Sequence, residues 1–123
     1  MNLSKSEVEL MNHLWNLEKA IMRDLIDAYK EPKPATTTVA TLLKRMQLKE
    51  FIGYVKVGRA RQYYPKISKT DYFSAQVKGL IKNFFNDSAT QFASFFTQET
   101  NLSKSELEEL KNIINSEIKK QIE

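Results

Sequence analysis

The fold is decided by residues 36–64, which read TTTVATLLKRMQLKEFIGYVKVGRARQYY. The first half carries an apolar stripe with helical spacing, formed by Val39, Leu42, Leu43 and Met46. Hydroxyl groups and cations occupy the opposite face. The second half predicts a hairpin of strands 55–57 and 62–64, with Gly58 in the turn because glycine accepts a positive φ. A helix of this kind followed by such a hairpin is typical of a winged helix-turn-helix.

Capping and periodicity signals place helices before this stretch. Ser4 and Glu7 have the spacing of a capping box, which opens a first helix, and Trp15 is an expected core anchor on it. A second helix is predicted from about residue 20 to residue 29. The prolines at 32 and 34 end it, because proline cannot continue the hydrogen-bond ladder of a helix.

The chain after residue 69 is again helical in pattern. Helices are predicted near 70–85, near 87–98, and from a second capping box at 103–106 onward. The string Asn-Leu-Ser-Lys-Ser-Glu occurs at 2–7 and again at 101–106, which indicates one helix start used twice. We therefore expect a mostly α-helical chain with a small β-hairpin. Residues 1–68 would form a winged-helix domain and residues 69–123 a helical domain.

Aromatic residues are frequent in the last third of the chain. The helices predicted there are not expected to form a core of their own that would bury them. Burial against a second copy would cover them and make this part a dimerisation arm. The alternative is that they pack back onto the first domain. The residues expected at the dimer interface are Phe84, Phe85, Phe92, Phe95, Phe96, Leu107, Leu110 and Ile114.

The positive charge is concentrated in the middle of the chain. Residues 33–69 hold nine lysines and arginines and one acidic residue, a net charge of +8, while the remaining ten cations and fourteen anions give −4. Such a distribution indicates a polyanionic partner, although a lysine-rich solvated surface is the simpler alternative for a charge run alone. The coincidence with a helix of recognition type favours double-stranded DNA.

The second helix of a helix-turn-helix places its N-terminal part against base edges in the major groove. Threonine suits this place because its hydroxyl can bond a phosphate or a base edge and its methyl can contact a thymine methyl. Arg45 stays open between a backbone clamp and a salt bridge, and either Thr36 or Thr37 is expected as the N-cap. The predicted DNA contacts are Thr37, Thr38, Thr41, Lys44, Arg45, Arg59, Arg61 and Tyr63.

Two points about the hairpin stay open in the sequence. Arg59 and Arg61 lie at or near its tip, where cations can reach the backbone or the minor groove, but the hairpin could instead shield the core. Tyr63 and Tyr64 point to opposite faces of one strand, so one of them belongs to the core and the other can bond a phosphate.

The sequence does not favour an enzyme. The chain has no cysteine, no glycine-rich phosphate loop and one histidine, His13, which we interpret as structural or solvated. We expect no metal and no cofactor. No signal peptide and no apolar run of the roughly 20 residues that cross a bilayer are present, so we expect no membrane insertion and a cytoplasmic location.

The chain resembles the penicillinase-repressor family of bacterial winged-helix regulators, which includes β-lactamase, methicillin-resistance and copper-transport repressors. The resemblance covers nearly the whole chain. It is carried by Ser4 and Glu7–Met11 with Leu14-Trp15, by Thr38–Met46, by Gly58–Ala60 with Tyr63–Pro65, and by Leu102-Ser103 with Glu106–Leu110. It implies a homodimeric repressor that binds a palindromic operator. Glu50 departs from the pattern, because the family usually has glycine before the first wing strand.

The resemblance also implies a route of induction. In the β-lactam branch, a membrane sensor's signal leads to proteolysis of the arm between an asparagine and a phenylalanine, six residues before the Leu-Ser helix start. Those positions are Phe95 and Phe96 here, and the asparagine is missing. The copper branch senses through a cysteine-rich site, which a chain without cysteine cannot form.

Two other functions compete with a sequence-specific repressor. One is a winged-helix adaptor whose hairpin docks on another protein. The net charge of +8 in residues 33–69 disfavours this function. The other is a non-specific architectural DNA binder, which would coat DNA where a repressor protects one short site.

Overall fold

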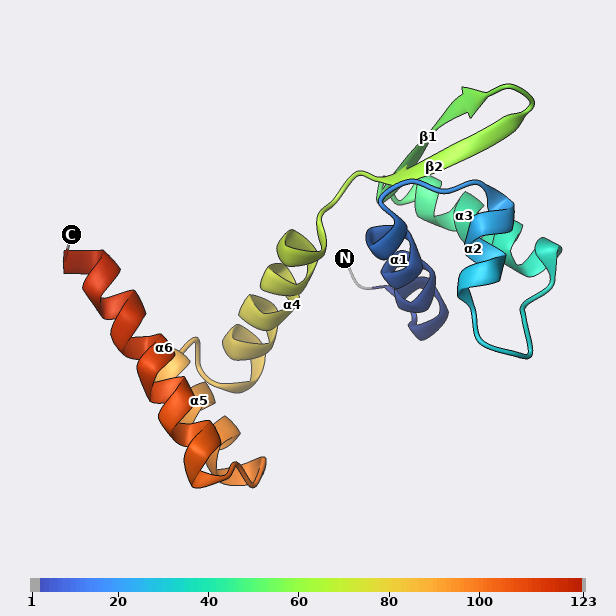
Figure 1. Cartoon of the computed structure of the whole chain (residues 1–123). Coiled ribbons are helices and arrows are strands. Elements are labelled where there is room, and N and C mark those ends of the chain that lie inside the picture. Colours follow the sequence, from blue (N-terminus) through green and yellow to red (C-terminus); the bar gives the residue numbers. More distant parts are fainter. Residues whose placement is uncertain (1–2, 123) are drawn as a thin grey trace. The chain divides into compact units, whose positions relative to one another are not determined.

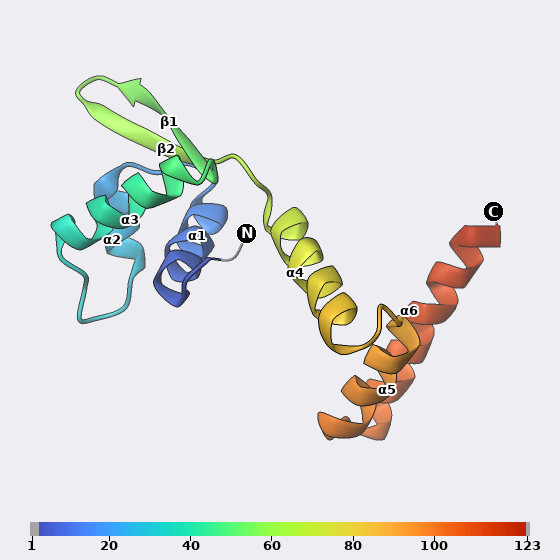
Figure 2. The ribbon, with the colours of Figure 1, turned by 180° about the vertical axis from the view of Figure 1, so that it is seen from behind.

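A computed structural model describes residues 3–122. Its elements, in chain order, are α1 (Lys5–Leu17), α2 (Met22–Ala28), α3 (Thr36–Leu48), β1 (Ile52–Val57), β2 (Ala60–Pro65), α4 (Lys69–Phe84), α5 (Ala89–Glu99) and α6 (Lys104–Ile122). Figures 1 and 2 show α1, α2 and α3 gathered at the base of the β1–β2 hairpin. The expected class, a mostly helical chain with a winged helix, is confirmed.

The capping box predicted at the first helix forms. The Glu7 amide donates to Ser4 Oγ over 3.2 Å, and the Ser4 amide donates to Glu7 Oε1 over 2.8 Å. Two of the free amides at the start of α1 are thus satisfied by side chains. At the other end of α1, Trp15 Nε1 donates to the Ile67 carbonyl over 2.9 Å. This bond fixes the chain that leaves β2 against the first helix.

The second helix is shorter than the predicted 20–29. Ala20 is extended and bridges to Tyr63: the Ala20 amide donates to the Tyr63 carbonyl over 2.9 Å, and the Tyr63 amide donates back over 2.7 Å. The prediction failed because an apolar residue beside a helix can equally pair with a strand from elsewhere in the chain. The bridge adds a minimal third strand to the hairpin.

The stripe predicted on α3 forms the centre of the core. Val39, Leu42, Leu43 and Met46 are all buried. The N-cap is Ala35, which makes no side-chain cap bond, so the expected threonine cap is wrong. Both candidate threonines lie in the first turn of the helix. The other buried apolar residues are Leu10, Met11, Leu14, Ala20, Leu25, Tyr29, Phe51, Ile52, Tyr63 and Tyr72.

The hairpin is longer than predicted and is antiparallel, with Ile52 opposite Pro65 and Val57 opposite Ala60. Its two-residue turn is Gly58-Arg59, and Gly58 has a φ of +63°. Positive φ at the first central position of a tight turn suits the twist of the strands. The turn therefore presents Arg59 at the tip of the wing.

Glu50 connects α3 to β1 in the left-handed region, with a φ of +67°. A side chain in that conformation costs about 1–2 kcal/mol, which is the physical reason for glycine at such a position. With glutamate at this position, α3 ends at Leu48 and β1 begins at Ile52.

The chain divides into two compact units, one through Gln76 and one from Val77. The first unit extends into α4, where Tyr72 and Phe73 each pack against Trp15 in a tilted arrangement, with ring centroids 5.9 Å apart in both pairs. The expected division at 68/69 stays a prediction.

Candidate nucleic-acid interface

One face of α3 is exposed and carries every residue that the sequence assigned to it. Thr37, Thr38, Thr41, Lys44 and Arg45 are all exposed, on the side opposite the buried stripe. None of their charged groups forms an ion pair within residues 3–122. The face is therefore a polar surface with free cations at one end.

Thr41 shows how the hydroxyls of this face are arranged. Its Oγ1 donates to the Thr37 carbonyl one turn earlier, over 3.0 Å. The donor is thereby occupied, while the oxygen can still accept a hydrogen bond and the methyl is free for an apolar contact. Thr41 is thus prepared to accept from an amino group and to pack on a methyl, both of which base edges offer in the major groove.

A hollow of about 500 Å³ adjoins this face. Thr38, Thr41 and Arg45 of α3 line one side, and Ser4 and Ser6 at the start of α1 line another. Arg45 lines this hollow and forms no ion pair with a carboxylate among residues 3–122. The salt-bridge alternative for Arg45 is therefore wrong. The serines were missed, because nothing in the sequence shows that the start of α1 lies beside α3.

Several lysines of the basic segment have structural partners and contribute less to a binding surface. Lys49 Nζ lies 2.8 and 2.9 Å from the two carboxylate oxygens of Glu7, which is 1% exposed. Lys33 Nζ donates to the carbonyls of Asp27 and Tyr29, at 3.0 and 2.6 Å, beyond the end of α2. The free charge is thus concentrated on α3 and the wing.

The Glu7 carboxylate is charged despite its burial. Desolvation alone would raise its pKa, but the hydrogen bonds from Lys49 and Ser4 together hold the pKa below its usual value of 4.5. Lys49 follows the last turn of α3 and Glu7 lies in the first turn of α1. The ion pair therefore fixes the position of α3 against α1.

The wing exposes both predicted arginines. Arg59 lies in the turn, and the Arg61 guanidinium lies 4.4 Å from the centre of the Tyr54 ring. Val55 and Val57 near the tip are 50% and 52% exposed. The outer part of the hairpin therefore does not shield the core, and only its base, with Ile52 and Tyr63, is buried.

Tyr63 needs correction as a predicted DNA contact. Its side chain is 7% exposed and belongs to the core, and its ring packs 5.8 Å from that of Tyr54. Tyr64 faces the other way and is 36% exposed, with its ring over Gly53, where an added Cβ would lie 2.6 Å from the hydroxyl. Strand alternation predicts that the two differ, but not which one is buried.

A second hollow, of about 400 Å³, lies between the start of α2 and the wing. Arg23, Arg59 and Arg61 line it together with Ile21, Met22, Ala60 and Tyr63. Arg23 was missed by the sequence analysis. The available signal was weak: a cation early in the second helix, outside the stretch 33–69 in which the charge was counted.

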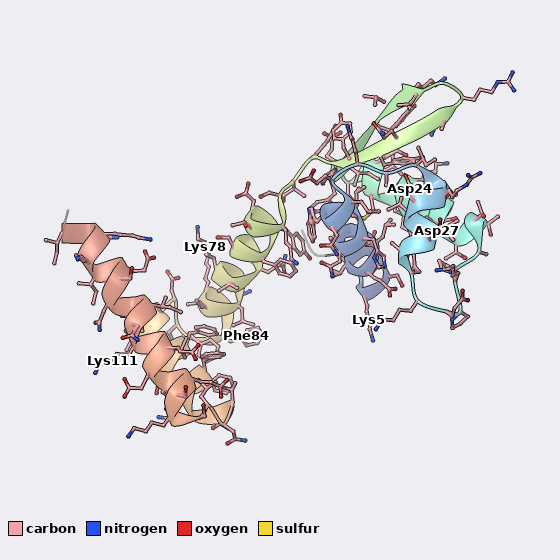
Figure 3. All side chains as sticks on the ribbon, in the orientation of Figure 1. Lys5, Asp24, Asp27, Lys78, Phe84 and Lys111 are labelled. Atoms are coloured by element: carbon pink, nitrogen blue, oxygen red, sulfur yellow. The ribbon has the colours of Figure 1, made fainter. Side chains whose placement is uncertain are left out.

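The second unit exposes its apolar residues. Among the expected dimer residues, Phe84, Phe95, Phe96, Leu107 and Ile114 are exposed by 77%, 52%, 38%, 40% and 57%. Phe84 is labelled at the end of α4 in Figure 3. Phe85, Phe92 and Leu110 are half-buried, and Phe85 contacts Phe92 and Phe95 with ring centroids 5.5 and 5.3 Å apart. No residue between 77 and 122 is buried.

Phe95 and Phe96, the expected cleavage position, lie within α5 and not in a loop. Among residues 3–122, no group of three or more acidic or histidine side chains is placed to hold a metal ion. No helix in that range is long and apolar enough to cross a membrane.

Comparison with known proteins assigns the family. The model of the penicillinase repressor family matches residues 3–116. The chain belongs to this family. Its members are DNA-binding transcriptional repressors and not enzymes, so the expected class is confirmed.

Two relatives, a methicillin resistance regulator and a penicillinase repressor, agree with the family assignment. The methicillin resistance regulatory protein MecI of Staphylococcus aureus (strain N315) is 29% identical over 114 residues, which cover 92% of this chain and 93% of MecI. The penicillinase repressor of Bacillus licheniformis is 26% identical over 113 residues, covering 91% and 88%. A solved CopR repressor structure is 30% identical and covers 55% of this chain and all of its own, with a TM-score of 0.47.

Proposed function

We propose that this protein is a sequence-specific transcriptional repressor that binds a palindromic operator as a homodimer. The observation that carries the proposal is the exposed face of α3, opposite a buried stripe. It holds three threonines and two cations that form no ion pair among residues 3–122. Each protomer would insert this face into one major groove, and the two grooves would lie on the same side of the duplex. Repression would be steric, because the bound dimer occludes the promoter.

The residues would divide the work by position. Thr38 and Thr41 would contact bases, and Thr37 or Lys44 would reach a base or a phosphate. Arg45 would hold the backbone from the hollow beside α1. Arg59 at the wing tip would contact the backbone or the adjacent minor groove.

The homodimer is supported by the second unit. Its exposed apolar side chains run along α4, α5 and α6, and it contains no buried residue between 77 and 122. Exposed apolar surface of this extent marks an association site, and a second copy covers it most simply. Induction would act by separating the two copies, since one half-site offers about half of the contacts.

Proteolysis of the arm, triggered by a membrane sensor, is one way to separate them. A cut between Phe95 and Phe96 would require α5 to open, because both residues are helical. A chain truncated after Phe96 should bind the operator much more weakly than the full chain. Equal affinity of the truncated and full chains would refute induction by dissociation.

Sequence-specific binding to DNA can be tested by substituting Thr41. An operator fragment is first selected from genomic DNA, and its binding is measured with Thr41→Val, which keeps the shape but removes the hydroxyl. We expect a loss of about 1–3 kcal/mol on the operator and little change on unrelated DNA. Arg59→Ala should weaken both and reduce the salt slope of log K by about 0.9. An adaptor would show no such dependence, and an architectural binder would show equal losses on both DNAs.

A further inference from the structure

We propose that Arg23, Arg59 and Arg61 form one seat for a phosphate group of the DNA backbone, separate from the face of α3. The proposal rests on the function proposed above, since it takes the bound polymer to be duplex DNA. It adds Arg23 to the interface, and it assigns the two wing arginines and Arg23 to a common ligand.

The seat is the hollow between α2 and the wing. The three arginines are exposed and line it from two directions, Arg23 from α2 and the others from the hairpin. The remaining walls are the apolar residues Ile21, Met22 and Ala60 and the side of Tyr63. The three arginines are therefore the only charged residues among those that line this hollow.

The charges of the seat are uncompensated. Within residues 3–122, no carboxylate forms an ion pair with any of the three arginines. The neighbouring carboxylate, Asp24, accepts a hydrogen bond from the Ile21 amide over 3.2 Å; Figure 3 labels it on α2. Three like charges around one hollow repel one another, and an anion placed among them removes that repulsion. Guanidinium groups also match phosphate oxygens with two parallel N–H donors.

Two features set the geometry of the seat before a ligand arrives. The Arg61 guanidinium rests over the Tyr54 ring, 4.4 Å from its centre, which restricts its motion. The Ala20–Tyr63 bridge joins the chain just before α2 to the strand that carries Arg61. Two backbone hydrogen bonds thus hold the chain before α2 against the wing, which limits how far the backbone at Arg23 can move from the hairpin.

A backbone phosphate fits these properties better than a base edge. The seat has three cations and apolar lining residues. These favour a compact anion and do not distinguish one base pair from another. A phosphate held there would set the register of the protein on the duplex, so that α3 meets its bases in one position. We expect this contact to raise the affinity for all sequences and to leave the choice among them unchanged.

The seat is tested with operator duplexes in which a single phosphate is replaced by a neutral methylphosphonate, scanned along both strands. For the full-length protein, one substitution near the wing should weaken binding about tenfold. The same substitution should weaken the Arg23→Gln and Arg59→Gln variants clearly less, because their seat is already incomplete. Lys82→Gln, which removes one exposed cation from α4, is the control and should behave as the unaltered protein. Arg23→Lys should fall between the unaltered protein and Arg23→Gln.

The outcomes separate the seat from the function it rests on. If Arg23→Gln gives the same methylphosphonate profile as the unaltered protein while Thr41→Val weakens operator binding, the seat is wrong and the repressor stands. If neither change matters, the proposed function fails as well. Thermal unfolding of each variant checks that the fold is intact. Saturable binding of inorganic phosphate at Arg23 that leaves DNA binding unaffected would also overturn the assignment to the DNA backbone.

Discussion

The string Asn-Leu-Ser-Lys-Ser-Glu begins a helix in each of the two units, yet its surroundings differ completely. Both capping boxes form: the Ser103 amide donates to Glu106 Oε1 over 3.0 Å and the Glu106 amide donates to Ser103 Oγ over 3.1 Å, much as at Ser4 and Glu7. Glu7 is buried and paired with Lys49, whereas Glu106 is exposed. Local sequence determines where a helix starts, but the surrounding core determines what its first turn contacts.

The contrast extends to the whole of each unit. In the first, α1, α2, α3 and the hairpin base enclose a common core. In the second, from Val77, helices of comparable apolar content leave their side chains exposed. A region with a closed core can be stable as one chain, whereas a region that leaves its apolar residues exposed is expected to gain stability from a partner. Substitutions in each unit can therefore test whether the second unit associates.

The largest effect should come from breaking the exposed apolar face of α6. Ile114→Asp combined with Ile118→Asp places two charges on side chains that are 57% and 52% exposed. If they meet a second copy, the dimer dissociates and operator affinity falls about 100-fold or more, because the two half-sites are no longer bound together. Sedimentation and a binding titration measure both effects. The control is Asn112→Asp, which adds a charge on another side of α6, about 140° around the helix from the expected interface residue Leu107. If the double variant Ile114→Asp and Ile118→Asp stayed dimeric, the interface would be refuted.

The next effect compares the interiors of the two units. Leu43→Ala removes a side chain that is 1% exposed and should lower the free energy of unfolding by about 2–5 kcal/mol. Phe95→Ala removes a larger side chain that is 52% exposed and should destabilise an isolated protomer less. Denaturant unfolding at low protein concentration measures the two. The reverse order would show that the second unit has a core that the single chain does not reveal.

The repeated capping box offers a matched pair of substitutions. Glu7→Gln removes a buried charge from Lys49 and should lower the free energy of unfolding by about 1–3 kcal/mol at pH 7. Glu106→Gln removes only an exposed charge, because the glutamine oxygen can still accept the bond from the Ser103 amide, and should do less. Chemical denaturation of each variant measures the difference. Equal effects would show that the Lys49 ion pair adds nothing to the cap.

The ion pair between Glu7 and Lys49 predicts how the stability of the protein depends on pH. The pKa of Glu7 is lower in the folded chain than its usual 4.5, so the stabilisation is complete above that value and is lost as the pH falls toward the folded pKa. Unfolding curves between pH 6 and pH 3 should therefore show a fall in stability below about pH 4.5 that is smaller in Glu7→Gln. A variant with the full fall would mean that other carboxylates cause it.

The smallest effect concerns Glu50. Glu50→Gly should stabilise the first unit by about 1 kcal/mol, because glycine adopts the φ of +67° without strain. The 3.9 Å contact between Lys66 and Glu50 is exposed and should offset little of this. Thermal unfolding of the variant measures the change. A loss of stability would mean that the contact with Lys66 outweighs the backbone strain.

The sequence predicted those parts of the molecule that depend on residues near one another in the chain. The stripe Val39–Met46, both capping boxes and the position of Gly58 in the turn follow from spacing alone. The sequence did not predict the Ala20–Tyr63 bridge or the approach of Arg23 to the wing, because both depend on where the chain returns after dozens of residues. It also did not show which of Tyr63 and Tyr64 is buried. Alternation along a strand separates two faces, but it does not say which face lies against the core.

The central claim is that the polar faces of two copies of α3 read two half-sites on one side of a duplex. Hydroxyl-radical footprinting of the full-length protein on its selected genomic fragment tests this directly. We expect two short protected segments, separated by about one or two helical turns of 10–10.5 base pairs, and weaker protection of both with Thr41→Val. Continuous protection without sequence preference, or protection unchanged by Thr41→Val, would contradict it.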